Sequence, residues 1–380
     1  SFRNNNRRDG VPNENVNYIT VDSQGRVWCT GNMAYPGYDG GASCFDGERF
    51  QSLAAVHGTS VHHMVEDDKG RLWFAITNMR TSAGEGIYCW DGEKCQRYSV
   101  EEGLASNTVR CLLVDRHGLL WIATSSGLCR FDGNSFRTFG EAEGLPALAV
   151  TTLLEDNDGH LWIGTEGGGA VRFDGVVFQP LQVADGLVDN RVWSLMQDRC
   201  GDIWIGTWKG VTRFRPRKTP PPVYITDVIA GSRHGAVDHF ELPVSESLLA
   251  FEFKGRSFRT RPGQMVFLYR LVGYEEEWRQ TRSRRVEYSH LPIGSYTFEV
   301  MAVDRDLNYS LAPARVQLEV VPDPRDAQID ELERRVYERT VELEEKNRQL
   351  EQARSAAEEA NRSKDSRRNN VINFYEGEWC

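Results

Sequence analysis

The chain has 380 residues, of which 40% are hydrophobic and 11% aromatic, and its formal net charge is -10. This length exceeds one ordinary domain, so two or three units are expected. The basic residues are scattered among acids, whereas a nucleic-acid surface needs clustered lysine and arginine, so we expect no nucleic-acid partner. No apolar run approaches the roughly 18 residues that span a bilayer, and the N-terminus lacks the charged-then-apolar order of a signal peptide, so no membrane segment is expected.

A repeat dominates the first 217 residues. Five segments share the frame D-x-x-G-x-x-W, and their tryptophans are separated by 45, 48, 41 and 42 residues. These tryptophans are Trp28, Trp73, Trp121, Trp162 and Trp204. A period in the low forties suits four short antiparallel strands, which is one blade of a β-propeller. The repeat therefore predicts five recognisable blades.

The third repeat illustrates how one blade is built. Its extended runs at residues 109–115, 119–125, 128–133 and 136–139 are rich in β-branched or aromatic residues, and each break carries Asp, Asn or Gly. The Asp and Gly of every D-x-x-G turn are therefore interpreted as structural. A calcium site at residues 156–159, Asp-Asn-Asp-Gly, is the alternative; it is disfavoured because the other turns lack the extra acid.

These repeats resemble the two-component regulator propeller family, whose unit reads DxxGxLWIGTxxGLxRFDG followed by GLPxN. The best matches lie at residues 158–175 and 202–214, with linking turns at 143–146 and 185–190. The resemblance covers roughly residues 1–217 and implies a sensory propeller.

The two ends of the repeat region leave two alternatives. Residues 1–15 read like the last strand and exit loop of a blade, and the fifth repeat has three strands before the proline-rich linker at 216–222. Residues 1–4 could supply the missing strand and close a five-bladed ring, which would remove exposed edges. The other alternative, which we favour, is a truncated propeller with more blades upstream.

Residues 218–322 predict a β-sandwich, with alternating strands at 248–258, 265–280, 284–306 and 314–321. This region resembles the triple-tyrosine domain that follows such propellers in sensor kinases, and the family's aromatic residues are expected to form the core. The matching residues are Tyr269, Leu271, Trp278, Tyr288, Leu291, Pro292, Gly294, Tyr296 and Val300. The loop at 306–310 departs from the family pattern.

Residues 327–366 predict a parallel coiled-coil helix, and residues 367–380 have no interpretation. Apolar residues recur one heptad apart, and a companion row is interrupted by Arg339 and Lys346. The predicted dimer seam comprises Ile329, Leu332, Val336, Leu343, Leu350, Ala353 and Ala357. A single solvated helix is the alternative to the expected homodimer.

Enzymatic chemistry is not predicted. The segment 339–365 looks like the helix that leads into the dimerisation domain of hybrid histidine kinases, yet no histidine follows His290 to act as phosphoacceptor, and no nucleotide-binding domain is recognised. GxSxG, HExxH and Walker motifs are lacking. His62 and His63 are adjacent in an extended run, so they point to opposite faces and are not expected to share a metal. We predict no catalytic residue, metal or cofactor.

The eight cysteines form no CxxC pair. Most of them are interpreted as small buried hydrophobic residues, which favours a reducing compartment.

Two loops indicate a ligand site. The turn between the second and third strands is short in repeats three to five but expands at residues 30–43 and 76–87. Long loops on a rigid scaffold often carry binding residues; that these loops only cap the ring is an equally weighted alternative. The predicted ligand-binding residues are Met33, Tyr35, Tyr38, Met79, Arg80, Arg191, Trp193, Trp208 and Lys209.

The function predicted from these observations is the sensory input and relay module of a bacterial two-component receptor, with a homodimer partner and a small-molecule or glycan ligand. The alternatives are a propeller enzyme, such as a polysaccharide lyase-like protein, and a protein-protein interaction scaffold. Because residues 320–333 run directly from strand into heptad, we predict a cytoplasmic location, with a periplasmic sensor as the alternative.

Overall fold

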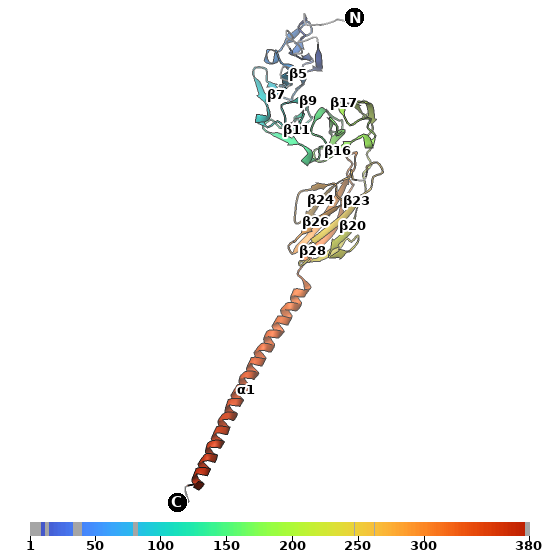
Figure 1. Cartoon of the computed structure of the whole chain (residues 1–380). Coiled ribbons are helices and arrows are strands. Elements are labelled where there is room, and N and C mark those ends of the chain that lie inside the picture. Colours follow the sequence, from blue (N-terminus) through green and yellow to red (C-terminus); the bar gives the residue numbers. More distant parts are fainter. Residues whose placement is uncertain are drawn as a thin grey trace. The chain divides into compact units, whose positions relative to one another are not determined.

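The computed structural model describes residues 9–11, 15–32, 40–78, 83–246, 248–261 and 263–376. The fold is mostly β with one C-terminal helix, α1 (Pro324–Glu376), which confirms the predicted fold class (Figure 1). The chain divides into two compact units. The first comprises residues 1–226, 252–286 and 298–315, and the second comprises residues 227–251, 287–297 and 316–380. The domain boundaries given from the sequence stay a prediction.

Five successive antiparallel sheets form the blades of the first unit, and each follows the order of the chain. The first is β1 (Val16–Val21), β2 (Val27–Gly31), β3 (Gly41–Phe45) and β4 (Phe50–Ser52). The second is β5 (Ser60–Glu66), β6 (Leu72–Asn78), β7 (Ala83–Trp90) and β8 (Cys95–Tyr98). The third is β9 (Val109–Val114), β10 (Leu120–Thr124), β11 (Gly127–Phe131) and β12 (Phe136–Phe139). The fourth is β13 (Val150–Glu155), β14 (Leu161–Thr165), β15 (Ala170–Phe173) and β16 (Phe178–Leu181).

The fifth blade has three strands in the described part of the chain, β17 (Val192–Gln197), β18 (Ile203–Thr207) and β19 (Gly210–Phe214). Residues 1–4, named as a source of its fourth strand, lie outside the described residues.

One hydrogen-bond pattern explains the repeated D-x-x-G-x-x-W frame. In the fourth blade, one oxygen of Asp156 accepts the backbone N–H groups of Asp158 and His160, and the other accepts the indole N–H of Trp162 at 2.9 Å. The same indole-to-carboxylate bond recurs in the other four blades at 2.7–2.9 Å. Gly159 has φ +86, a conformation that favours glycine. The structural interpretation of the turn is therefore confirmed, and the Asp156 carboxylate that a calcium ion would need is already occupied by protein donors.

Three of these tryptophans also contact the neighbouring blade. Trp73, Trp121 and Trp162 lie 5.7, 6.0 and 5.5 Å from a phenylalanine of the next blade's third strand. Those partners are Phe131, Phe173 and Phe214. A buried aromatic ring removes about 150–250 Å² from water, which is worth roughly 4–6 kcal/mol before chain entropy is subtracted. The core therefore runs from blade to blade rather than lying within one sheet.

The outer faces of the first and last blades are apolar and exposed. Ile19 on β1 is 61% exposed, whereas the residue at the same register position in the third blade, Leu112, is 1% exposed. Val211 on β19 is 62% exposed, whereas its counterpart Leu128 is completely buried. Both end faces thus have the composition of a blade-blade interface.

Two further sheets form the sandwich. One has the order β21 (Ser232–Arg233), β20 (Val223–Ala230), β23 (Leu248–Gly255) and β26 (Arg285–Ser289). The other has the order β22 (His239–Pro243), β28 (Ala314–Val321), β27 (Gly294–Val303), β24 (Val266–Val272) and β25 (Arg279–Thr281). Tyr288 and Tyr296 are buried, and the Tyr269 ring lies 6.4 Å from that of Phe298. The interpretation of the family's aromatic residues as core is confirmed for these three.

The helix α1 is longer than predicted at both ends. Its start is fixed by Asp323, whose carboxylate accepts the backbone N–H of Arg325 at 2.8 Å, and by Pro324, a residue well suited to the first helical position. The predicted seam side chains Ile329, Leu343 and Leu350 are exposed. A search of the described helical residues found no stretch that combines the length and the apolar character needed to cross a membrane.

The cysteines agree only partly with their interpretation as buried residues. Of the seven cysteines described, Cys29, Cys89, Cys111 and Cys129 are buried, which agrees with the interpretation of most of them; Cys44 is half-buried, and Cys95 and Cys200 are exposed. Both stand in polar segments next to turns, where a strand's apolar alternation no longer determines burial.

Candidate functional site

The predicted ligand site can be followed at four of its nine residues. Met33, Tyr35, Tyr38, Met79 and Arg80 lie outside the described residues. The other four all belong to the fifth blade.

The structure brings these four residues together. The ring of Trp193, on β17, lies 6.3 Å from the ring of Trp208, in the turn between β18 and β19. The Arg191 guanidinium lies 5.2 Å from the Trp208 ring. Arg191 and Lys209 each approach the Asp189 carboxylate at 3.4 Å. The backbone N–H of Arg191 is the main reason why the pKa of Asp189 is lowered. Both indoles are exposed, so this cluster offers a flat aromatic surface beside two cations. Its binding of a ligand stays a prediction.

His63 has a packing role in the inner strands. Its ring lies 4.0 Å from that of Tyr18, and its Nδ1 accepts the backbone N–H of Leu112 at 3.4 Å. Its Nε2 lies 3.8 Å from the Cys111 sulfur. Burial lowers the pKa of His63 to about 4. The ring is therefore neutral at neutral pH and accepts a backbone hydrogen bond.

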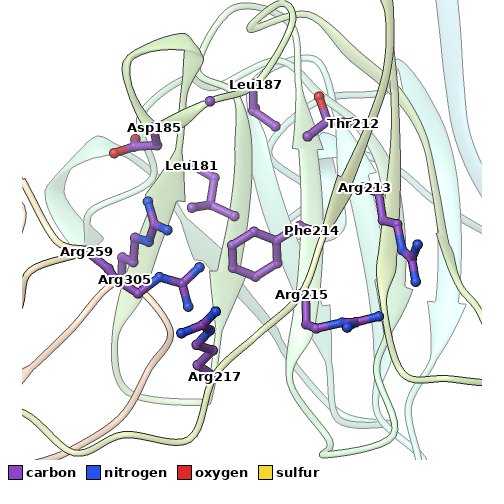
Figure 2. A pocket seen from close by; sticks show the side chains of 11 residues that line it. Leu181, Asp185, Leu187, Thr212, Arg213, Phe214, Arg215, Arg217, Arg259 and Arg305 are labelled. Atoms are coloured by element: carbon purple, nitrogen blue, oxygen red, sulfur yellow. The ribbon is translucent and has the colours of Figure 1, made fainter.

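A cavity in the first unit was not predicted from the sequence. It measures about 320 Å³ and is formed by the fourth and fifth blades, the segment that follows them, and two loops of the sandwich (Figure 2). Its lining comprises Leu181, Asp185, Gly186, Leu187, Thr212, Arg213, Phe214, Arg215, Arg217, Arg259 and Arg305. Five arginines thus face one space.

Two of these arginines are neutralised beside Phe214. Arg213 and Arg215 both donate to the buried carboxylate of Asp202, the latter at 2.7 and 2.8 Å. Donation from Arg215 is the main cause that lowers the pKa of Asp202, to about 2. A further pair, Arg261 and Asp185, closes one rim with two bonds of 2.7 and 2.9 Å.

Two of the remaining three arginines, Arg259 and Arg305, approach a single acid, Asp306. Arg217, Arg259 and Arg305 all line the cavity (Figure 2). Arg259 donates to Asp306 at 3.3 Å, and the Nε of Arg305 lies 3.9 Å from the other oxygen of that carboxylate. Burial raises the pKa of Asp306. Within the described part of the chain, no carboxylate pairs with the Arg217 guanidinium.

Only some of the arginines that line this cavity stand together in the sequence. The run Arg213-Phe214-Arg215-Pro216-Arg217 concentrates charge at the end of the fifth blade. Arg259 and Arg305 come from sandwich loops, and only the fold brings them to the same place.

The sandwich loop that departs from the family pattern contacts the fourth blade within the first unit. The Arg172 guanidinium donates to the backbone oxygen of Asp306 at 2.8 Å, and the Tyr309 hydroxyl donates to the Asp174 carboxylate. Val177 is buried against an apolar cluster that includes Leu307. The unusual loop is thus a docking element.

An exposed group of His239, Glu241 and Glu319 was also not anticipated. The atoms that could bind a metal lie within 4.8 Å of one another because β22 pairs in parallel with β28. Exposed acids often gather in this way without a metal.

The fold and these sites define a class of protein: a repeat propeller followed by an immunoglobulin-like sandwich. Comparison with known families agrees with this architecture. Residues 103–126, 144–167 and 186–209 match the two component regulator propeller, and residues 260–321 match the Y_Y_Y domain. The chain therefore carries two-component regulator propeller repeats and a Y_Y_Y domain, which confirms the resemblance seen in the sequence.

Solved structures similar to this chain include an extracellular domain of a two component system, a secretion-system component and an enzyme. The extracellular domain of the hybrid two component system BT3049 from B. thetaiotaomicron is 19% identical with a TM-score of 0.42, over 82% of this chain and 51% of that chain. PorZ of the Porphyromonas gingivalis type-IX secretion system is 16% identical with a TM-score of 0.43, over 80% of this chain and 44% of that chain. Virginiamycin B lyase from Staphylococcus aureus is 13% identical with a TM-score of 0.39, over 78% of this chain and 93% of that chain.

This chain spans about half the length of the first of these structures. The comparison with curated proteins gave no match. The named two-component neighbour is an extracellular domain, which corresponds to the alternative location considered from the sequence; the location of this chain stays a prediction.

Proposed function

We propose that this chain is the sensory input and relay module of a bacterial two-component receptor. The propeller binds a ligand or partner, and the sandwich passes a change of geometry to a dimeric coiled coil that acts on a kinase output domain. The two component regulator propeller repeats and the Y_Y_Y domain support the class of sensor. The role proposed for this chain is binding and relay, without catalysis.

The exposed apolar seam of α1 is the observation that carries the proposal. Leu343 and Leu350 are 60% and 66% exposed, and Val336 is 65% exposed. Surface ion pairs such as Glu342 with Lys346 contribute only about 0.3–0.5 kcal/mol each. Helices are stabilised mainly by packing of an apolar face, and a heptad seam fits a second identical helix. A homodimer would bury this seam.

A hydrogen-bond cluster at the start of the helix supports the relay. In the second unit, the Ser245 hydroxyl, from the turn after β22, donates to the Asp323 carboxylate. Arg325, in the first turn of α1, donates to the same carboxylate at 2.7 Å and to the Ser245 oxygen at 3.1 Å. Donation from Arg325 is the main reason why the pKa of Asp323 is lowered. A shift of the turn after β22 would therefore directly displace the first turn of α1.

Light scattering on the full chain tests the dimer on which the relay depends. We expect twice the chain mass for the unmodified protein and a single-chain mass for Leu350→Asp, because a charge in the seam must be desolvated. Ser355→Asp, with the same new charge on the outer helix face, should remain dimeric. Equal masses for the two variants would contradict the seam, and a single-chain mass for all three proteins would overturn the proposed relay.

A further inference from the structure

We infer that the cavity lined by five arginines, described above, is a binding site for a phosphate group. The group is either inorganic phosphate or the phosphate of a small phosphomonoester. The inference rests on the cavity alone and does not depend on the proposed sensor function.

Charge is the first argument. Arg217, Arg259 and Arg305 face the same space, and Asp306 is the one carboxylate that serves them, so an excess of two positive charges remains. Like charges held side by side favour a bound counter-charge. A phosphate group carries about -1.5 to -2 charges at pH 7, which matches this excess.

Geometry is the second argument. Guanidinium groups present planar forks of N–H donors that suit the oxygens of a phosphate. Arg213 and Arg215 are already occupied by Asp202, and Arg261 is occupied by Asp185. The donors left for a ligand belong to the other three arginines, which come from the segment after the fifth blade and from two sandwich loops.

An unsatisfied polar pair lies next to the cavity. The Nε of Arg305 and the Oδ1 of Asp306 are both buried without a hydrogen-bond partner, and they lie 3.9 Å apart. Buried polar atoms are rarely left unpaired. Arg305 lines the cavity, so the oxygens of a bound phosphate can approach the terminal nitrogens of its guanidinium, whereas Asp306 does not line the cavity.

The volume of the cavity is compatible with two sources of the phosphate group. About 320 Å³ is ample for an inorganic phosphate and leaves room for a small organic group attached to it. Titration calorimetry on the full chain at pH 6.5 and constant ionic strength separates the sources, with sodium phosphate and glucose 6-phosphate as titrants and sodium sulfate as the comparison. Tighter binding of phosphate indicates the free ion, and tighter binding of glucose 6-phosphate indicates a phosphomonoester; either supports the site.

Three variants locate the binding. Arg217→Gln and Arg305→Gln should each weaken phosphate binding about tenfold or more, as expected for loss of one charge-assisted hydrogen bond. Arg199→Gln removes the same charge from an exposed turn of the fifth blade outside the cavity and should leave binding unchanged.

Each variant is first compared with the unmodified chain by thermal unfolding without ligand. If Arg305→Gln fails to fold, Arg217→Gln, whose side chain makes no ion pair in the described structure, decides alone. No heat with either phosphate compound, or equal weakening in Arg199→Gln, would each overturn the inference.

Discussion

Arg172 connects the turn and the core of the fourth blade with the docked sandwich loop. Its buried guanidinium approaches Asp156 at 3.1 Å, donates to His160 at 2.9 Å, and reaches the backbone oxygen of Asp306. Asp156 in turn accepts the indole N–H of Trp162. The turn, the blade core and the docked sandwich loop therefore depend on one ion pair.

The Asp156→Asn variant should be strongly destabilised. It removes the nearer and buried counter-charge of Arg172 and leaves only the exposed Asp158 carboxylate, 3.8 Å away; breaking a buried pair costs roughly 3–5 kcal/mol. The matched control is Asp115→Asn, since Asp115 serves the same turn and indole in the third blade and pairs with no arginine in the described part of the chain, and it should lose only about 1 kcal/mol. Urea denaturation at pH 7 measures both. Losses of equal size would show that Arg172 finds compensation elsewhere.

His63 should make stability depend on pH. Its pKa is about 4 in the folded chain, against an ordinary value of 6.5, so the unfolded chain takes up the proton first. Stability is therefore complete above pH 6.5 and falls as the pH decreases from 6.5 towards 4. The total loss is at most about 3 kcal/mol.

Denaturation midpoints of His63→Gln between pH 4 and 7 measure this dependence. That variant should show a flatter profile than the unmodified chain, whereas His57→Gln, a change at an exposed histidine, should keep the full slope. An unchanged slope in His63→Gln would assign the dependence to other groups.

At the scale of elements, the docking loop gives a direct test. Tyr309→Phe keeps the ring but removes the hydroxyl that donates to Asp174, so a charged acceptor loses its partner. A hydrogen bond to a charged group is worth about 1.5–3 kcal/mol. We expect a lower unfolding temperature and faster amide hydrogen exchange in residues 303–309. Tyr337→Phe, on the exposed surface of α1, is the control and should change neither; slow exchange retained in Tyr309→Phe would contradict the docking role.

All the repeating elements could be predicted from the sequence, whereas several of those that do not repeat were missed. The D-x-x-G turn and the tryptophan six residues after its Asp mark two strands of every blade, because local hydrogen bonds fix both. The strands β20, β21, β22 and β25 carry no such marker and were not predicted. The parallel partner of β22 lies about 80 residues away in the sequence, so no local pattern could indicate it.

The candidate sites follow the same logic. Arg191, Trp193, Trp208 and Lys209 were predicted together because they occupy equivalent positions on one blade face, and the structure places them in one cluster. The cavity lined by five arginines could not be predicted, because it depends on where two sandwich loops meet the fifth blade. Local patterning determines blades, whereas the meeting of distant segments determines the cavity.

For the whole molecule, the exposed faces of the first and fifth blades influence the order in which the blades unfold. Stability in stacked repeats is approximately a sum of units and of the interfaces between neighbours. The fourth blade holds the docked loop and the fifth borders the cavity, whereas the face of the first blade that carries Ile19 is exposed. The first blade should therefore open before the others.

Limited proteolysis followed by mass spectrometry checks this order. Early cuts should fall between residues 46 and 60, at the far end of the first blade, while fragments that begin in the second blade persist. Early cuts within the fourth blade would contradict the order.

The apolar end faces have one more consequence, which concerns handling of the protein in solution. Two surfaces that each resemble half of a blade interface are complementary in kind, so the first blade of one molecule can meet the fifth blade of another. Such a head-to-tail contact does not close on itself, and its product is a growing chain of molecules whose length rises with concentration. Turbidity that depends on protein concentration and persists in Leu350→Asp would thus report propeller stacking, separately from the helix.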